Sequence, residues 1–133
     1  MHFELLTLSG VKYAGDVEQV SLATVEGELG ILPHHEPMTA IAVGGPLTIR
    51  TKGKTEVFAT FGGLLEVTDN QVRLLADEAE HQDDLIVSEI EASLKLAVEQ
   101  KTAAKDKREL ATAQGLVDRN SVRLGVARMR RHR

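Results

Sequence analysis

Short runs in which hydrophobic and polar residues alternate fill most of the chain before residue 83. The clearest run is residues 47–51, where Leu47 and Ile49 alternate with polar side chains. A period of two places alternate side chains on opposite faces of a β-strand. Comparable short runs predict strands at residues 3–8, 11–13, 17–23, 38–43, 47–51, 56–61, 64–67 and 72–75.

Turn signals separate these runs. Residues 52–54, with Gly53 at the centre, predict a hairpin turn, and the polar residues 68–71 predict another. Gly62 and Gly63 indicate a bulge or a close approach of two backbones. Many short strands joined by close turns predict an antiparallel β-sandwich, or a flattened barrel, over residues 1–82.

The hydrophobic period changes to that of a helix near residue 83. Asp83 or Asp84 is the expected cap of a first helix, whose apolar stripe comprises Val87, Ile90, Leu94, Ala97 and Ala104. Asp106 is the expected cap of a second helix, whose stripe comprises Leu110, Ala113, Val117, Leu124 and Ala127, with Asn120 in the seam. We therefore expect an antiparallel two-helix hairpin over residues 83–133. Both stripes are narrow, so the hairpin should pack weakly and detach at low cost.

One stretch combines turn formers with two histidines: Gly27-Glu28-Leu29-Gly30-Ile31-Leu32-Pro33-His34-His35-Glu36-Pro37. Gly27 and Gly30, which bracket Glu28 and Leu29, predict a tight turn. Pro33 ends a short apolar segment, and Pro37 forces an extended residue before it. Local chemistry leaves two interpretations open, a plain turn with a stiff loop or a loop that presents its side chains to a partner.

This stretch resembles the signature of the epsilon subunit of bacterial and chloroplast F-type ATP synthases, which is called delta in mitochondria. Two further matching segments, residues 62–67 and 72–80, follow in the family's order, and the resemblance covers essentially the whole chain. Within the signature, family members usually carry glycine where this chain has His34. The resemblance implies a β-sandwich followed by a helical hairpin.

The resemblance also implies a function. The chain would be a non-catalytic rotor subunit in the central stalk, and its sandwich would bind the gamma subunit and the c-ring to couple proton flow to ATP synthesis. It would be a peripheral membrane protein, held through the complex on the cytoplasmic face, or on the stromal face of the thylakoid in a plastid. The residues that match the family's partner-binding motif are Glu28, Leu29, Gly30, Pro33 and His35.

The net charge of −4 conceals an asymmetry. Residues 1–82 carry a net charge of −7 and residues 83–133 a net charge of +3, and the basic residues from 119 onward are Arg119, Arg123, Arg128, Arg130, Arg131 and Arg133. A solvated helix end, binding of nucleic acid or anionic lipid, and docking on an acidic protein surface all fit this pattern. On the residues alone, the solvated helix end is favoured.

The family resemblance favours docking on an acidic surface. It implies that the C-terminal helices inhibit ATP hydrolysis by placing Arg119, Arg123 and Arg128 against an acidic segment of the β subunits in the alpha/beta catalytic hexamer. The alternative is a standalone adaptor whose basic helix binds nucleic acid. The acidic first part of the chain and an aromatic content of 3% argue against that alternative, because few rings are available to stack on bases.

The sequence contains no pattern that indicates catalysis or a cofactor. It has no cysteine, and its five histidines are scattered or adjacent rather than spaced as zinc ligands. No apolar run approaches the roughly 20 residues that span a bilayer, and the first residues lack the basic start of a signal peptide. We therefore expect no catalytic residue, metal or cofactor.

Some members of the family bind ATP through an Ile/Leu-Asp-x-x-Arg-Ala motif at the first helix. The matching run here begins at Leu85 and has Ile86, Glu89 and Ile90 in place of the motif's Asp, Arg and Ala. Arg119 and Arg123 match arginines of the ATP-binding members. Because a carboxylate stands where phosphate needs a cation, we expect no tight ATP binding.

Overall fold

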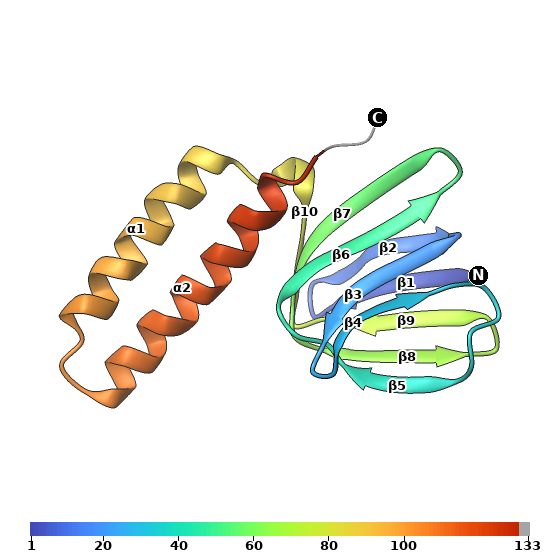
Figure 1. Ribbon diagram of the computed structural model, residues 1–133, viewed down its shortest axis with the longest axis horizontal. Helices are drawn as coiled ribbons and strands as arrows, with labels where there is room; N and C mark the ends of the chain where they lie inside the picture. Colours follow the sequence, from blue (N-terminus) through green and yellow to red (C-terminus); the bar gives the residue numbers. More distant parts are fainter. Residues whose placement is uncertain (131–133) are drawn as a thin grey trace.

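The chain forms a two-layer β-sandwich with a helical hairpin beside it (Figure 1). The computed structural model describes residues 1–130. One sheet contains, in spatial order, β2 (Gly10–Asp16), β1 (His2–Thr7), β9 (Gln71–Leu75), β8 (Leu64–Thr68) and β5 (Met38–Ile41). The other contains β10 (Glu78–His81), β7 (Lys54–Phe61), β6 (Gly45–Thr51), β3 (Gln19–Thr24) and β4 (Gly27–Ile31).

The predicted sandwich is confirmed, with two differences in its pairing. The sheets do not close into a barrel, although a bridge between Thr24 and Ala42 joins them at one corner. β1 and β9 pair in parallel, whereas the other strand pairs are antiparallel. Because these two strands are far apart in sequence, no turn signal could indicate their direction.

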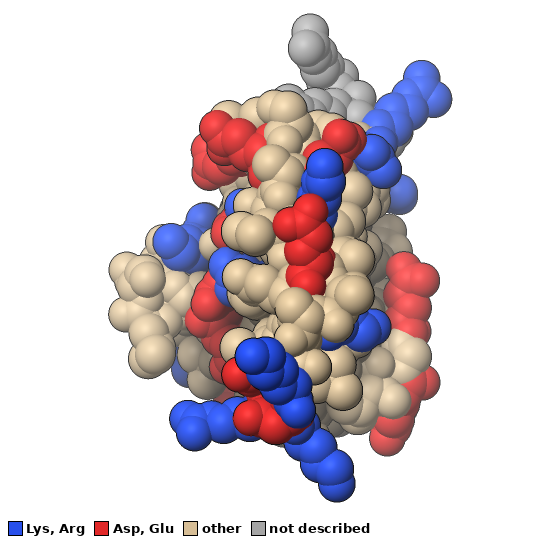
Figure 2. Space-filling view, turned by 90° about the vertical axis from the view of Figure 1, so that its left-hand side faces the viewer, with Lys and Arg blue, Asp and Glu red and all other residues tan. Residues whose placement is uncertain are grey.

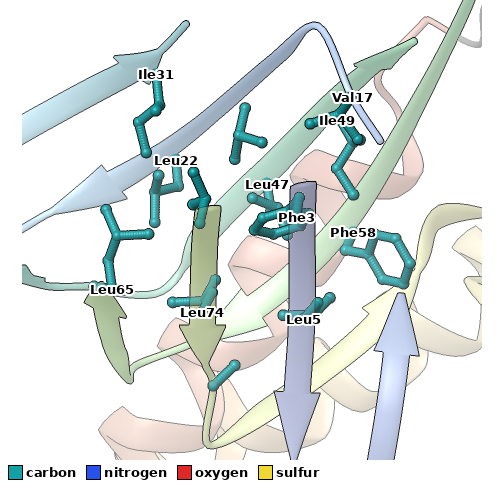
Figure 3. Packing of buried hydrophobic residues seen from close by; sticks show 14 of the residues in the cluster. Phe3, Leu5, Val17, Leu22, Ile31, Leu47, Ile49, Phe58, Leu65 and Leu74 are labelled. Atoms are coloured by element: carbon teal, nitrogen blue, oxygen red, sulfur yellow. The ribbon is translucent and has the colours of Figure 1, made fainter. Parts of the chain in front are cut away.

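The core lies between the sheets and consists of the inward side chains of alternating strands (Figure 3). β1 buries Phe3 and Leu5, and β6 buries Leu47 and Ile49, as the period of two predicts. The other fully buried large side chains of the sandwich core are Val20, Leu22, Ile31, Leu65, Val67, Val72 and Leu74. This aliphatic core holds the two sheets together by removing apolar surface from water.

Strands β2 and β10 are among those that differ from the sequence prediction. β2 continues through Asp16 instead of ending at Tyr13. β10 was not predicted, because its sequence, Glu-Ala-Glu-His, offers Ala79 as its one aliphatic side chain. As an edge strand with one partner, β10 needs little apolar surface, and its two glutamates face away from the core.

The helical hairpin follows β10 through the 3₁₀ helix η1 (Gln82–Asp84) and contains α1 (Val87–Ala103) and α2 (Lys107–Ala127). Asp106 caps α2 as predicted, since its side chain accepts a 2.8 Å hydrogen bond from the Glu109 amide. The predicted cap of α1 is wrong: Asp83 and Asp84 lie in η1, and Ile86 occupies the cap position. The structure buries Ile90 and Ala97 of α1, and Ala113, Asn120 and Val126 of α2.

The expected stripes are buried in part: Ala97 and Ala113 are buried, whereas Leu94 and Val117 are only partly buried. Leu110 was expected in the second stripe, but its side chain is exposed. α2 lies between α1 and the sandwich (Figure 1). Its last turns cover the outer face of β7 in a second apolar cluster that includes Val57, Ala59 and Val126.

Candidate partner-binding surfaces

The first candidate surface begins at the turn between β3 and β4. The tight turn predicted at Gly27–Gly30 is wrong, because these residues form strand β4, whose Glu28 pairs with Ala23 of β3. The turn lies earlier in the chain, at residues 24–27. The Thr24 hydroxyl there donates to the Gly27 carbonyl at 2.7 Å and accepts from the Glu26 amide at 3.2 Å.

β4 divides its predicted site residues between two faces. Glu28 and Gly30 point outward and are exposed, whereas Leu29 packs against the core beside buried Ile31. Because β4 is the last strand of its sheet, its outer edge has no strand partner. Glu28 and Gly30 are therefore available to a partner, and Leu29 is chiefly part of the packing that fixes the strand.

Pro33 and His35 lie in the loop that connects β4 to β5. Pro33 is exposed, and the His35 side chain is half-buried with Nδ1 2.8 Å from the Glu36 carbonyl oxygen. His34 has a φ of +65°, the left-handed conformation that favours glycine. Its amide donates to Asn70 Oδ1 at 2.9 Å, which ties the loop to the turn between β8 and β9. The loop thus keeps a left-handed conformation at the position where the family usually has glycine.

A groove of about 430 Å³ lies along the free edges of β4 and β5. Glu26 and Glu28 contribute carboxylates to it. Val25, Ile41 and Leu64 line it as well, and these three side chains are exposed despite being apolar. Exposed apolar side chains beside open strand edges are typical of a surface that a partner covers.

The second candidate surface is the arginine-bearing side of α2. Arg119 forms ion pairs with Glu78 and with Glu80, the latter at 3.3 Å, and its guanidinium lies 4.9 Å from the centre of the Phe61 ring. Arg123 Nε donates to Glu80 Oε2 at 2.8 Å. Two of the three predicted arginines therefore bind carboxylates of β10 in the same chain.

Arg128 belongs to a different part of the surface. It follows the last residue of α2, and its Nη2 donates to Glu91 Oε1 of α1 at 2.7 Å. The three arginines therefore do not form one continuous row, because Arg128 faces the first helix. Arg131 and Arg133 of the predicted basic tail lie outside the described residues.

No pattern in the sequence indicates which groups hold these arginines. In the sequence, Glu78 and Glu80 have the pattern of solvated acids before a helix, and no local signal distinguishes Gln82. Gln82 is buried, and its Nε2 donates to the carbonyls of Val126 and Met129, both at 2.9 Å. Alternation in the short run Glu78–His81 could have shown that both glutamates share one face.

The segment that corresponds to the family's ATP-binding motif carries no cation at the matching positions. Ile86 is exposed at the start of α1, and Glu89 lies in its first turn. A shallow groove of about 290 Å³ lies between the helices and includes Arg119 and Arg123 in its lining. Both arginines are already paired with glutamates.

Two other titratable side chains, His81 and Tyr13, have defined contacts within the chain. Residues 1–130 contain no group of three or more side chains arranged to hold a metal ion. His81 Nδ1 accepts from the Asp83 amide at 3.0 Å and its ring packs edge-on against Phe58. Burial raises the pKa of Tyr13, and the nearby Glu56 carboxylate raises it further.

Figure 2, which looks onto the hairpin, shows charges of both signs spread over this face. Basic side chains gather at its lower end, where the turn between the helices lies in Figure 1. Lys105, Lys107 and Arg108 belong to this turn and the start of α2. The hairpin therefore does not present one uniformly basic face.

Comparison with known proteins assigns the chain to a family. Residues 1–82 match the family model described as "ATP synthase, Delta/Epsilon chain, beta-sandwich domain". The ATP synthase epsilon chain of Herpetosiphon aurantiacus is 35% identical over 133 residues, which cover 100% of this chain and 98% of the relative. That of Halalkalibacterium halodurans is 35% identical over 128 residues and covers 96% of each chain.

Solved structures agree on the fold. A chain in the Euglena gracilis mitochondrial ATP synthase superposes with a TM-score of 0.81 at 20% identity, covering 90% of this chain and 76% of that one. A chain of the Tetrahymena thermophila mitochondrial ATP synthase central stalk and c-ring superposes with a TM-score of 0.70 at 16% identity, covering 96% of each. From its sandwich, its helical hairpin and its full-length relatives, the chain belongs to the delta/epsilon family of ATP synthase subunits.

Proposed function

We propose that this chain is the epsilon subunit in the central stalk of an F-type proton-translocating ATP synthase. It is a non-catalytic rotor subunit that links the c-ring to the gamma subunit and thereby couples proton flow to ATP synthesis. The observation that carries this proposal is the similarity to epsilon chains over all 133 residues. Residues 1–82 form the domain that binds gamma and the c-ring, and residues 83–133 form a regulatory arm.

The surface of the sandwich supports the coupling role. Glu28 is an exposed carboxylate on the free edge of β4, beside the groove that Val25, Ile41 and Leu64 line. Apolar contacts can supply affinity there, while a carboxylate can fix the orientation of a polar or basic loop. Glu28, Gly30, Pro33 and His35 are proposed to contact the c-ring or gamma, with Leu29 holding β4 in place.

The membrane association follows from the complex. Within residues 1–130 no helix has both the length and the apolar character needed to cross a bilayer. Through its place in the complex, the chain is proposed to be a peripheral protein on the cytoplasmic face of the membrane, or on the stromal face of the thylakoid in a plastid.

The arm is proposed to inhibit ATP hydrolysis by docking Arg119, Arg123 and Arg128 on acidic groups of the alpha/beta hexamer. Guanidinium groups pair well with carboxylates, and each partly desolvated pair contributes on the order of 1–3 kcal/mol. The alternative of a nucleic-acid adaptor is less favoured, because the first part of the chain is acidic and an aromatic content of 3% leaves few rings to stack on bases.

Replacing Arg119, Arg123 and Arg128 with alanine should raise ATP hydrolysis in reconstituted complexes and leave assembly and synthesis largely intact. Deleting the hairpin should raise hydrolysis at least as much, and the relief should shrink at high salt. The matched control replaces Lys105, Lys107 and Arg108, which removes the same charge from the hairpin turn. Equal hydrolysis rates in the parent, triple-alanine and truncated complexes at low salt would show that the arm is not a brake.

A further inference from the structure

The alternation of β10 places two carboxylates on the side of the strand that faces α2. Glu78 and Glu80 both bind Arg119, and Glu80 also accepts from Arg123. Only 27% of the Glu80 side chain and 24% of the Arg123 side chain are exposed. Ion pairs that are partly withdrawn from water are screened less than pairs at the open surface.

The same cluster is tied to neighbouring groups on both elements. Arg123 Nη1 donates to Asn120 Oδ1 at 3.0 Å, and buried Asn120 donates to the Leu116 carbonyl. The Arg119 guanidinium rests on the Phe61 ring of β7. A partly buried, connected polar cluster favours one arrangement of two elements, because moving either element breaks several interactions at once.

The hairpin has other attachments to the sandwich. Val57 and Ala59 of β7 share an apolar cluster with Val126, and further side chains of the last turns of α2 pack against this cluster. Gln82 adds two hydrogen bonds to carbonyls at the end of α2. The ion pairs act alongside this apolar packing and are the charged part of what holds α2 in place.

We propose that Glu78 and Glu80 form an electrostatic latch that holds α2 on the sandwich and keeps Arg119 and Arg123 from acidic partners. The arginines have two competing sets of carboxylates, those of β10 in the closed chain and those of the partner when the hairpin is released. The latch itself depends only on the contacts within this chain. Its consequence for hydrolysis rests on the proposed function of the arm.

The latch can be tested in the isolated chain, which has no natural cysteine. Val57→Cys places a single thiol under α2, so its alkylation rate measures how often the hairpin detaches, even when the detached state is rare. Glu78→Gln/Glu80→Gln should speed this alkylation about tenfold, which corresponds to about 1.4 kcal/mol. Glutamine keeps the size of each side chain and removes only the charge.

Two controls separate the latch from general effects. Glu89→Gln/Glu99→Gln removes the same charge from exposed positions of α1 that form no ion pair within residues 1–130, and it should leave the rate unchanged. Leu74→Cys, in the core of the sandwich, reports global unfolding, and its alkylation should stay far slower than that of Val57→Cys in both the parent and the latch variant, which shows that Val57→Cys reacts by detachment of the hairpin rather than by unfolding.

Salt provides a second measurement. Raising ionic strength from about 0.01 M to about 1 M shortens the Debye length from about 30 Å to about 3 Å. Alkylation of Val57→Cys should therefore accelerate in the parent and change little in the latch variant. Equal rates in parent and latch variant, or an undiminished salt response in the latch variant, would overturn the proposal.

In the assembled complex, the latch variant should lower ATP hydrolysis, because more hairpins are free to dock. This is opposite to the effect expected for the arginine-to-alanine variant. Faster alkylation with unchanged hydrolysis would support the latch and contradict the braking role. Unchanged alkylation would contradict the latch whatever the hydrolysis rate.

Discussion

Gly63 should be among the least replaceable residues of the sandwich. It stands where the chain leaves β7 in one sheet and enters β8 in the other, with a φ of +123°. A Cβ added there would lie 2.1 Å from the Leu75 carbonyl oxygen and 2.8 Å from the Ala76 Cα. Both obstacles are backbone atoms at the end of β9, so they cannot move without disturbing the sheet.

The cost of Gly63→Ala has two parts. A non-glycine residue at such a φ costs on the order of 1–3 kcal/mol. Forcing a methyl group into a filled space costs on the order of another 1–3 kcal/mol. The substitution should therefore lower the free energy of unfolding by about 2–6 kcal/mol, a large share of the roughly 5–15 kcal/mol typical of a domain.

Two other glycines allow the conformational cost to be measured separately from the cost of steric overlap. Gly10 and Gly27 have φ values of +118° and +115°, and an added Cβ would meet nothing within 4 Å at either position. Gly10→Ala and Gly27→Ala should therefore show the conformational cost alone.

The measurement is urea unfolding followed by far-ultraviolet circular dichroism. An extra loss of about 2 kcal/mol in Gly63→Ala would lower the midpoint by about 1 M, for a typical slope of about 2 kcal/mol per M. If Gly63→Ala loses no more stability than Gly10→Ala, the close approach deduced for this corner is wrong.

Three further outcomes are expected. Glu28→Lys should reduce ATP-driven proton pumping by membranes that carry the variant, while the exposed position keeps the change in stability within about 0.5 kcal/mol; normal pumping would count against this contact site. Calorimetry with Mg-ATP should detect no low-micromolar binding to the isolated chain, because Ile86 and Glu89 replace the motif's Asp and Arg; such binding would require other ligating residues. A fragment of residues 1–82 should fold and bind gamma. Its free energy of unfolding should be lower by about 2 kcal/mol, because α2 no longer covers Val57; an unfolded or non-binding fragment would refute the independence of this domain.

The parts of the fold that the sequence predicted are those with local causes. Alternation in residues 47–51 reports a strand because one face is buried there, and Asp106 reports a helix start because its cap bond is local. The close approach indicated by Gly62 and Gly63 is also present at Gly63. Each of these signals depends on a few neighbouring residues.

Three features that sequence reasoning misses have non-local causes. The turn assigned around Glu28 is a strand, because pairing with β3 overrides the preference of glycine for turns. β10 was missed because its partner β7 supplies the hydrogen bonds and its sequence has little hydrophobic signal. Likewise, the carboxylates that bind Arg119 and Arg123 lie about 40 residues earlier in the sequence, as the 39 and 43 residue separations show. Only the fold could bring them together.

That separation changes how the basic charge of the chain should be understood. In the sequence, the acidic first part and the basic second part resemble two independent surfaces. In the structure, Glu78 and Glu80 of the first part form ion pairs with Arg119 and Arg123 of the second part, across the contact between β10 and α2. A partner that attracts the arginines must therefore replace the glutamates, so its affinity depends on the difference between two sets of ion pairs. Such a difference is small even when each set is strong. Removing a charge at Glu78 or Glu80 should consequently shift the equilibrium between the closed and released hairpin more than removing a charge elsewhere on the hairpin surface.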